Sequence, residues 1–370
     1  MHVEVVRNPS ELAALGEAWN DLAARATPAS PALTLEWFLA WWEAFADGAE
    51  LYVLSVRDGG RVLALAPLML ATRREWGFRW RVASLATNAH SPQAGLLLGE
   101  RAGECLDEIL RHFAGNVVPW DLLRLDHLVK GPELDRIVDR LRTLGLSHLV
   151  EVRRTAPALD ISGGWEEFLG GRGRSFRDSI KRKVKKASKA GATVSVHAGR
   201  VDADPLVERA FAVASRSWSG RHGTAINSTR DLATFYRGLA ARMARKGWLS
   251  LAFFERDGRD LAFELNLDYA GARHALKMAF DEAHGELSPG QVLRFHVLKD
   301  AFERGLGGFY FLGDREEHKD HWASRWDDHC RLTVYSHRFL PGARHLVRGP
   351  LWERARRIPY LRRLKRLLMG

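Results

Sequence analysis

Apolar and polar residues follow the same order of periods twice along this chain. In the first copy, residues 51–56 and 61–70 are apolar runs on either side of an Arg-Asp-Gly-Gly turn, which predicts a β-hairpin. Two segments with helical spacing precede it, 10–25 and 34–46, and we expect the Ser and the Thr at their starts to cap them. The pattern therefore predicts two helices followed by a hairpin.

The second copy begins after residue 200. Helical patterns over 204–218 and 229–246 precede strands over 248–255 and 261–270, again with an Asp-Gly turn between the strands. In both copies a third strand, a helix and a further apolar strand follow, at 81–88, 103–113 and 120–127 in the first and at 273–280, 291–304 and 308–314 in the second. A repeated β-α-α-β-β-β-α-β order predicts two domains of one architecture.

Turn-forming residues mark the joint between the two copies. Pro157 and the pair Gly163-Gly164 lie there, in a stretch that neither repeated pattern includes. We therefore expect an N-terminal domain over residues 1–155, a C-terminal domain over 156–340 and a basic amphipathic tail over 341–370.

The composition supports two buried cores and excludes several classes of protein. The chain has 370 residues, of which 46% are hydrophobic and 10% aromatic, and this excludes general disorder. The two cysteines, Cys105 and Cys330, are far apart, which excludes a disulfide scaffold and a thiolate zinc site and fits a reducing compartment. Without a signal-peptide pattern or 18 uninterrupted apolar residues, we expect a soluble, cytoplasmic protein.

The net charge of +11 is concentrated in two short segments. Residues 172–189 and 344–370 each hold nine basic residues and one acid, so the rest of the chain has a net charge of −5. Residues 175–191 predict a helix with apolar positions at i, i+4, i+8 and i+11 and basic residues around most of its circumference. Such a helix binds nucleic-acid phosphates, binds the phosphates of a nucleotide-linked acceptor, or is a solvated face.

The tail mixes leucines and aromatic residues with its basic residues. That composition over 344–370 is typical of an interfacial helix on an anionic membrane, which would place the protein peripherally at the inner face of the membrane. Alternatively the tail packs on the body as a terminal helix.

Three stretches of sequence carry a resemblance to a known family: residues 66–68, 277–305 and 311–322. Together with the repeated order of elements, they resemble the GNAT acyltransferase fold in the tandem arrangement of FemAB-like proteins, and the CelD/BioF2-like acetyltransferase branch more closely. That branch is linked to bacterial polysaccharide synthesis. The resemblance implies an α/β (α+β) fold with tandem GNAT-like domains, each a mixed, mostly antiparallel sheet flanked by helices.

A Ser-Pro-Gly sequence precedes the helix of the second copy and suggests an anion site. Ser288 suits the N-cap and the proline suits the first helical position, so the N–H groups of Gly290, Gln291 and Val292 would form a cradle at the positive end of the helix. The resemblance implies that the pyrophosphate of coenzyme A lies at 290–293, which includes Leu293. An ordinary capped helix start is the alternative.

The usual GNAT signature of spaced glycines is incomplete here, since only Gly285 and Gly290 are present. The donor therefore stays open between acyl-CoA and the aminoacyl-tRNA that FemAB-like relatives use. Residues 91–95 occupy the corresponding region of the first copy and have no such cradle, so we expect that domain to bind or shape the acceptor.

Three side chains of the second copy are candidates for catalysis. Glu264, in the middle of a strand, becomes a base if it points into a cleft, or is simply solvent-facing. Asp281 ends a strand beside the cradle, where it orients an acceptor amine or forms a turn. Lys319 looks like the lysine that follows the last strand in FemAB-like enzymes, or it is a solvated charge. No metal is expected, because His318 and His321 have no third ligand at a known spacing.

These observations predict an acyltransferase. We expect it to move acetyl from acetyl-CoA to an amine or hydroxyl of a sugar, nucleotide-sugar or cell-envelope precursor by direct attack, since no activated nucleophile is evident. The alternatives are a FemAB-like aminoacyltransferase that uses aminoacyl-tRNA, and a non-catalytic tandem-GNAT scaffold in polysaccharide biosynthesis.

Overall fold

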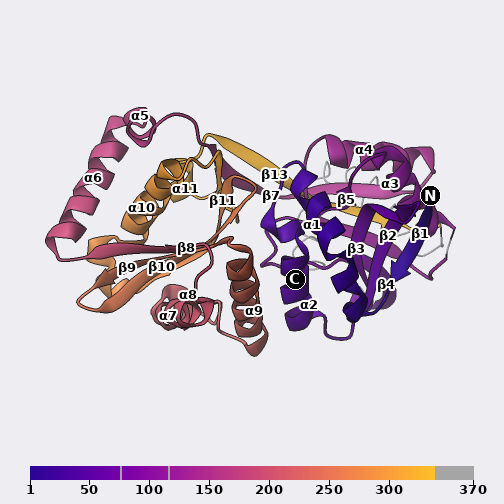
Figure 1. Cartoon of the computed structure of the whole chain (residues 1–370), viewed down its shortest axis with the longest axis horizontal. Coiled ribbons are helices and arrows are strands. Elements are labelled where there is room, and N and C mark those ends of the chain that lie inside the picture. Colours follow the sequence, from indigo (N-terminus) through magenta and orange to yellow (C-terminus); the bar gives the residue numbers. More distant parts are fainter. Residues whose placement is uncertain (76, 116, 338–370) are drawn as a thin grey trace, which may run out of the picture.

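One mixed sheet runs through the whole molecule and carries helices on its faces (Figure 1). The computed structural model describes residues 1–75, 77–115 and 117–337. The strand order across the sheet is β1-β2-β3-β4-β6-β13-β7-β12-β11-β10-β9-β8, with β5 paired to β3. Most neighbouring strands are antiparallel, and β4–β6 and β11–β12 are parallel.

The first half of the chain forms one lobe. Its elements are β1 (His2–Val6), η1 (Pro9–Leu15), α1 (Gly16–Arg25), η2 (Pro31–Leu33), α2 (Leu35–Phe45), β2 (Glu50–Asp58), β3 (Arg61–Glu75), β4 (Phe78–Leu85), β5 (Leu97–Leu98), α3 (Ala102–Ala114), β6 (Leu122–Val129), α4 (Pro132–Thr143) and β7 (His148–Asp160).

The second half forms the other lobe. Its elements are α5 (Trp165–Gly170), α6 (Arg174–Lys189), β8 (Thr193–Ala198), α7 (Ala203–Arg216), α8 (Trp218–Arg221), α9 (Arg230–Lys246), β9 (Leu249–Arg256), β10 (Arg259–Tyr269), β11 (Ala272–Phe280), η3 (Glu282–Leu287), α10 (Pro289–Glu303), β12 (Gly308–Tyr310), α11 (Glu317–Asp320) and β13 (Arg325–Tyr335).

The element order confirms the predicted repeat, and backbone conformation adds to it. The helices α3 and α10, which correspond in the two copies, both begin after a non-glycine residue in the left-handed region, Arg101 at φ 55° and Ser288 at φ 52°. Positive φ is uncommon outside glycine, so a matched pair indicates one architecture built twice. Thr34 caps α2 as predicted, since its hydroxyl accepts from the Trp37 N–H. The prediction for Ser10 is wrong: the chain there first forms η1, which Asn8 caps.

The last strand of the chain joins the two lobes. β13 lies between β6 and β7, so residues of the second half complete the sheet of the first. β7 in turn pairs with β12 through residues 158–160. The predicted domain boundary after residue 155 therefore falls inside β7, along which the sheet is continuous. The limits 1–155 and 156–340 stay a prediction, and the tail over 341–370 lies outside the described residues.

Helices of the two lobes also pack directly on each other. Trp37 of α2 is buried and makes an edge-to-face contact with Phe235 of α9, with 5.4 Å between ring centroids. Both belong to one apolar cluster that also includes Trp41 and Tyr236. This contact and β13 hold the lobes in the arrangement that leaves the functional site beside α10.

Candidate functional site

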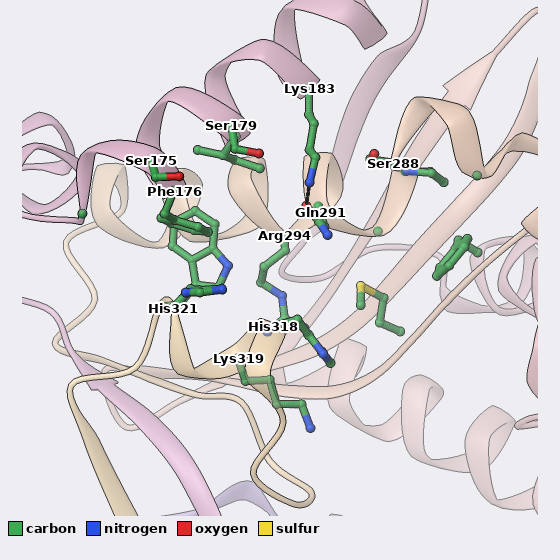
Figure 2. A pocket seen from close by; sticks show the side chains of 18 of the residues that line it. Ser175, Phe176, Ser179, Lys183, Ser288, Gln291, Arg294, His318, Lys319 and His321 are labelled. Atoms are coloured by element: carbon green, nitrogen blue, oxygen red, sulfur yellow. Dashed lines mark hydrogen bonds between the residues drawn. The ribbon is translucent and has the colours of Figure 1, made fainter.

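A cavity of about 910 Å³ lies in the second lobe, between α6, α10, α11 and the end of β11 (Figure 2). Six basic side chains line it: Arg174, Lys183, Arg294, His318, Lys319 and His321. Its other lining residues are polar or apolar, and none is Asp or Glu. We call it the cationic pocket. Its volume is typical of ligand sites, and its side chains favour an anion.

The pocket exists because two parallel strands separate. β11 pairs with β12 only from Ala272 to His274, and from there to Phe280 it stays paired with β10 alone. The chain after β12 stays with β7, since the Phe311 N–H donates to the Pro157 carbonyl, and then turns away through Leu312 at φ 53°. We call this the β11–β12 splay. Met278 and Phe280, from the part of β11 beyond its pairing with β12, line the pocket.

The start of α10 contributes a smaller cradle than predicted. Ser288 and Gly290 line the pocket, but the N–H groups of Gln291 and Val292 both donate to the Ser288 carbonyl, at 3.0 and 3.1 Å. They are therefore not available to an anion, which leaves the Gly290 N–H. The Ser288 side chain does not cap α10 because the residue is in the left-handed conformation. Proline occupies the first helical position as expected.

Side chains of α6 close the pocket opposite α10. Lys183 Nζ donates to Gln291 Oε1 at 2.5 Å, and Lys186 Nζ donates to the Glu286 carbonyl at 2.7 Å. At the other end of the pocket the Phe176 ring stacks on His321, with centroids 4.8 Å apart. The basic helix expected over 175–191 is thus a wall of the pocket.

Two of the residues predicted for the cradle lie in the core. Val292 and Leu293 are buried, and neither lines the pocket. Both belong to the apolar cluster that α10 forms with Leu298, Phe309 and other residues of the second lobe. Successive side chains project in different directions around a helix, so these two point inward while Gln291 and Arg294 face the pocket.

Glu264 lies behind the pocket wall. It is fully buried, and its Oε2 accepts from Nε of Arg294 at 2.8 Å. Burial raises the pKa of Glu264, and the charge of Arg294 opposes that effect. The guanidinium of Arg294 also lies 5.4 and 5.3 Å from the rings of Phe309 and Phe311. Glu264 therefore orients Arg294 at the pocket, and solvent-facing alternation does not apply to it.

Asp281 is occupied by other partners. Its Oδ2 lies 3.2 Å from Arg216 and 3.0 Å from Arg259, and its Oδ1 accepts from the Ala283 N–H to cap η3. It is buried and does not line the pocket. The geometry matches the turn-forming alternative and leaves no free oxygen for an acceptor amine.

Lys319 lines the pocket but has three partners of its own. Its Nζ donates to the carbonyls of Leu312 and Asp314, at 3.2 and 3.1 Å, and to Glu316 Oε1 at 2.7 Å. An ammonium group has three N–H donors, so these contacts use all of them. Lys319 thereby fixes the chain at the β11–β12 splay.

Sequence reasoning considered His318 and His321 only as metal ligands and missed Phe176, Lys183 and Arg294. The two histidines line the cationic pocket, and burial lowers the pKa of His318. Among residues 1–75, 77–115 and 117–337, no group of three His, Cys, Asp or Glu side chains could hold a metal ion. The position of Lys183 on a predicted helix gave no sign that it faced α10.

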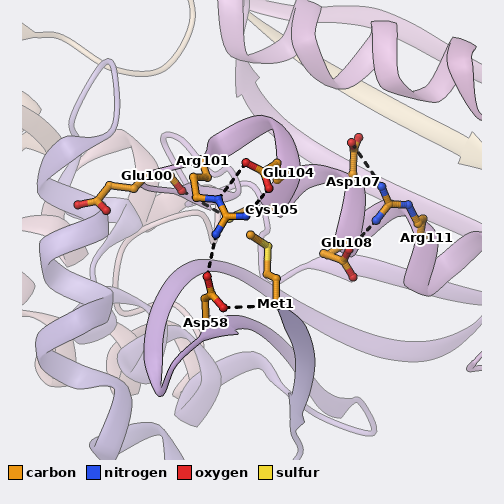
Figure 3. Close-up of polar contacts among 9 residues, drawn as sticks. All are labelled: Met1, Asp58, Glu100, Arg101, Glu104, Cys105, Asp107, Glu108 and Arg111. Carbon is orange, nitrogen blue, oxygen red and sulfur yellow. Dashed lines mark hydrogen bonds and ion pairs between the residues drawn. The ribbon is translucent and has the colours of Figure 1, made fainter.

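At the start of α3 in the first lobe, the described side chains form ion pairs with one another. There Arg101 donates to Asp58 at 2.7 Å and pairs with Glu104, and the Met1 amino group lies 3.5 Å from Asp58 (Figure 3). These ion pairs occupy the start of α3, where α10 in the second lobe leaves an open wall.

The loop before α3 is also held by hydrogen bonds to the sheet. Arg154 of β7 donates to the carbonyls of Ser91 and Pro92, and the Ala94 N–H donates to the His127 carbonyl at 3.1 Å. The loop over 91–95 is therefore bound to β6 and β7.

Residues 174–320 match the family model described as Acetyltransferase (GNAT) domain. All residues that line the cationic pocket lie in that range, except Gly173, His321 and Trp322. No curated protein matches the chain. Among the described residues, no helix is long and apolar enough to cross a membrane.

Solved structures share the two-lobed arrangement at low sequence identity. The crystal structure of FemX is similar over 93% of this chain and 100% of that chain, with a TM-score of 0.64 and 14% identity. A C-terminal domain (DUF2156), from an Agrobacterium fabrum protein assigned as a lysylphosphatidylglycerol synthetase, gives a TM-score of 0.54 and 12% identity over 90% of this chain and 94% of that one. A Bacteroides thetaiotaomicron protein of unknown function gives a TM-score of 0.56 and 7% identity, over 90% of this chain and 100% of that one.

Proposed function

We propose that this chain, which has a tandem GNAT fold of the FemAB-like kind with a GNAT acetyltransferase domain in its second half, transfers an acyl group from a donor bound in the cationic pocket. The observation that carries the proposal is the pocket itself. It lies at the β11–β12 splay, borders the start of α10, and is lined by six basic side chains and no acidic one.

The donor that best suits this pocket is acetyl-CoA. A diphosphate group needs positive charge and an N–H donor, and Lys183, Arg294 and the Gly290 N–H supply them from two sides. The apolar wall of Met278 and Phe280 suits the uncharged arm that joins the diphosphate to the thioester.

The acceptor amine or hydroxyl attacks the thioester carbonyl directly. The first lobe, whose own α3 start is occupied by ion pairs, shapes the acceptor site. By resemblance to the CelD/BioF2-like branch, the acceptor is a sugar, a nucleotide-sugar or another cell-envelope precursor. A cytoplasmic location, with contact to the inner face of the membrane through residues 344–370, belongs to the same proposal.

Calorimetric titration of coenzyme A into the full chain tests the donor. We expect saturable binding, and the substitution Lys183→Gln should weaken it about tenfold because it removes a cation from the pocket wall. Lys185→Gln, on the same helix but exposed to solvent, is the matched control and should bind as the wild type does. Absence of binding at millimolar coenzyme A would favour the non-catalytic scaffold.

A FemAB-like aminoacyl transfer is the second candidate. It is favoured by the exposed basic side chains of α6, among them Lys181, Arg182 and Lys189, which continue outward from the pocket and fit an RNA backbone. Thermal unfolding separates the two donors: stabilisation by coenzyme A supports acetyl transfer, whereas stabilisation by tRNA alone supports aminoacyl transfer.

A further inference from the structure

One lysine at the β11–β12 splay has no role in the pocket described above. Along the end of β11, beyond its pairing with β12, Met278 and Phe280 project into the cationic pocket. The register with β10 is regular over these positions, so Lys277 and Ala279 project from the opposite face of the sheet. Ala279 packs there with the cluster that contains α9. Lys277 therefore faces the side on which the first lobe meets the second.

Lys277 lies where the two lobes and the pocket come together. The last β11–β12 pair is His274–Tyr310, so Lys277 is three residues into the splay. Three other basic groups are within electrostatic reach of it: Lys319 of α11, Arg154 of β7 and His90 of the loop after β4. Lys319 is itself a wall residue of the pocket, and the other two belong to the first lobe.

The surroundings of Lys277 favour the neutral amine. Burial, followed by the charges of Lys319 and Arg154, lowers its pKa from the ordinary value. Within the described part of the chain, no hydrogen bond or ion pair joins Lys277 to another residue. Nζ of Lys277 is thus without a hydrogen-bond partner there, in contrast to Nζ of Lys319.

We propose that Lys277 accepts the proton of the attacking acceptor group, an inference that rests on the proposed acyl transfer. The acceptor nitrogen or oxygen forms a bond to the thioester carbonyl carbon, and its proton passes to Lys277 Nζ. The C–S bond then breaks, and the coenzyme A thiolate takes a proton from the Lys277 ammonium group. The donor reaches the splay from the α10 face, and the acceptor from the face that Lys277 occupies.

Three other titratable side chains near the splay have polar partners. Glu264 holds Arg294, and the carboxylate oxygens of Asp281 accept from two arginines and a backbone N–H. Lys319 uses its three donors on the chain around it. Lys277 has no such partner among the described residues and faces the first lobe, and both features suit proton transfer.

Trace labelling of the free protein, with no acceptor present, tests the protonation state of the Lys277 amine. The full chain is treated with a limiting amount of trinitrobenzenesulfonate between pH 7 and 11, and modified peptides are quantified by mass spectrometry. Because burial and the nearby charges lower the pKa of Lys277, we expect its labelling midpoint to lie below the ordinary lysine value, which Nα-acetyl-lysine amide labelled in parallel provides. Equal midpoints would overturn the proposal.

Substitution tests the role in catalysis. Thiol release from acetyl-CoA is followed with a panel of amino sugars and nucleotide-sugars as acceptors. We expect Lys277→Ala to lower kcat about 100-fold or more, with the KM for acetyl-CoA and the Kd for coenzyme A unchanged, and added methylamine to restore part of the rate. Lys299→Ala, at a lysine outside the pocket wall whose side chain is 42% exposed and pairs with Glu303, should be fully active.

The outcomes separate this inference from the proposed function. A wild type that neither binds coenzyme A nor releases thiol overturns both. A wild type that is active while Lys277→Ala retains its kcat overturns only the role of Lys277. Acetylation of Lys277 by acetyl-CoA, seen as a 42 Da increase in its peptide, would make it a nucleophile and also contradict proton transfer.

Discussion

Nε of Arg294 lies 2.8 Å from Oε2 of Glu264, and both side chains are buried between α10 and the sheet. The two residues are thirty positions apart, on a helix and on a strand. Their contact fixes one cation of the pocket from behind, where solvent does not screen it.

Removing the carboxylate should destabilise the protein. Glu264→Ala leaves the buried charge of Arg294 without its partner, and loss of one member of such a pair costs about 3–5 kcal/mol. Glu264→Gln keeps an acceptor oxygen and should cost less. Urea unfolding measures the difference.

An exposed ion pair is the control for this effect. Arg237 and Glu208 lie 2.7 Å apart on the surface, and Glu208→Gln should change the free energy of unfolding by about 1 kcal/mol or less. A Glu264→Ala protein as stable as Glu208→Gln would mean that Arg294 finds solvent or another partner.

Gly290 should be sensitive to a single added methyl group. A Cβ there would lie 3.3 Å from Cδ1 of Phe280 and 3.6 Å from Met278, so Gly290→Ala must displace the pocket wall. We expect a loss of about 1–3 kcal/mol in stability and at least tenfold weaker binding of coenzyme A. Gly285 also lines the pocket, but a Cβ there meets no atom within 4 Å, so Gly285→Ala should leave both quantities unchanged.

Local features of the fold could be predicted from the sequence, and distant pairings could not. The cap at Thr34 and the Asp-Gly hairpins depend on residues a few positions apart, and the structure confirms them. The insertion of β13 between β6 and β7 depends on pairs such as His329–Val129 and His329–Arg154, which no local pattern records.

The site shows the same limit. The helix start at Ser288-Pro289-Gly290 was evident, but the Ser288 carbonyl takes two of the three N–H groups expected for an anion. The contribution of Arg294 depends on Glu264, and that of Lys183 depends on how α6 packs across α10. These contacts arise from tertiary packing, so composition and spacing predicted the place of the pocket better than its walls.

Buried histidines should make the protein sensitive to acid. Burial lowers the pKa of His90 and His127 to about 4, and that of His274 and His329 to about 3. In the unfolded chain histidine titrates near 6.5, so below that pH the unfolded state binds more protons. The stability is therefore complete above pH 6.5 and falls as the pH decreases toward 4.

Each such histidine contributes a slope of about 1.4 kcal/mol per pH unit over that window. Urea unfolding at pH 7.5, 6 and 5 gives the slope. His274→Gln should reduce the slope by the contribution of one histidine, about 1.4 kcal/mol per pH unit. His2→Gln, at an exposed position, should leave it unchanged. A stability independent of pH between 6.5 and 4 would contradict the neutral buried state of these residues.

The α2–α9 contact should stabilise both lobes, which β13 also joins into one unfolding unit. Trp37→Ala removes a large buried ring from the cluster that both lobes share, so we expect a loss of about 3–5 kcal/mol. Because β13 also joins the lobes, the variant should still unfold in one transition with a lower midpoint. Calorimetry distinguishes this from two separated transitions, which would show that the lobes are independent. Trp218→Ala, at an exposed tryptophan of α8, is the control and should change the midpoint little.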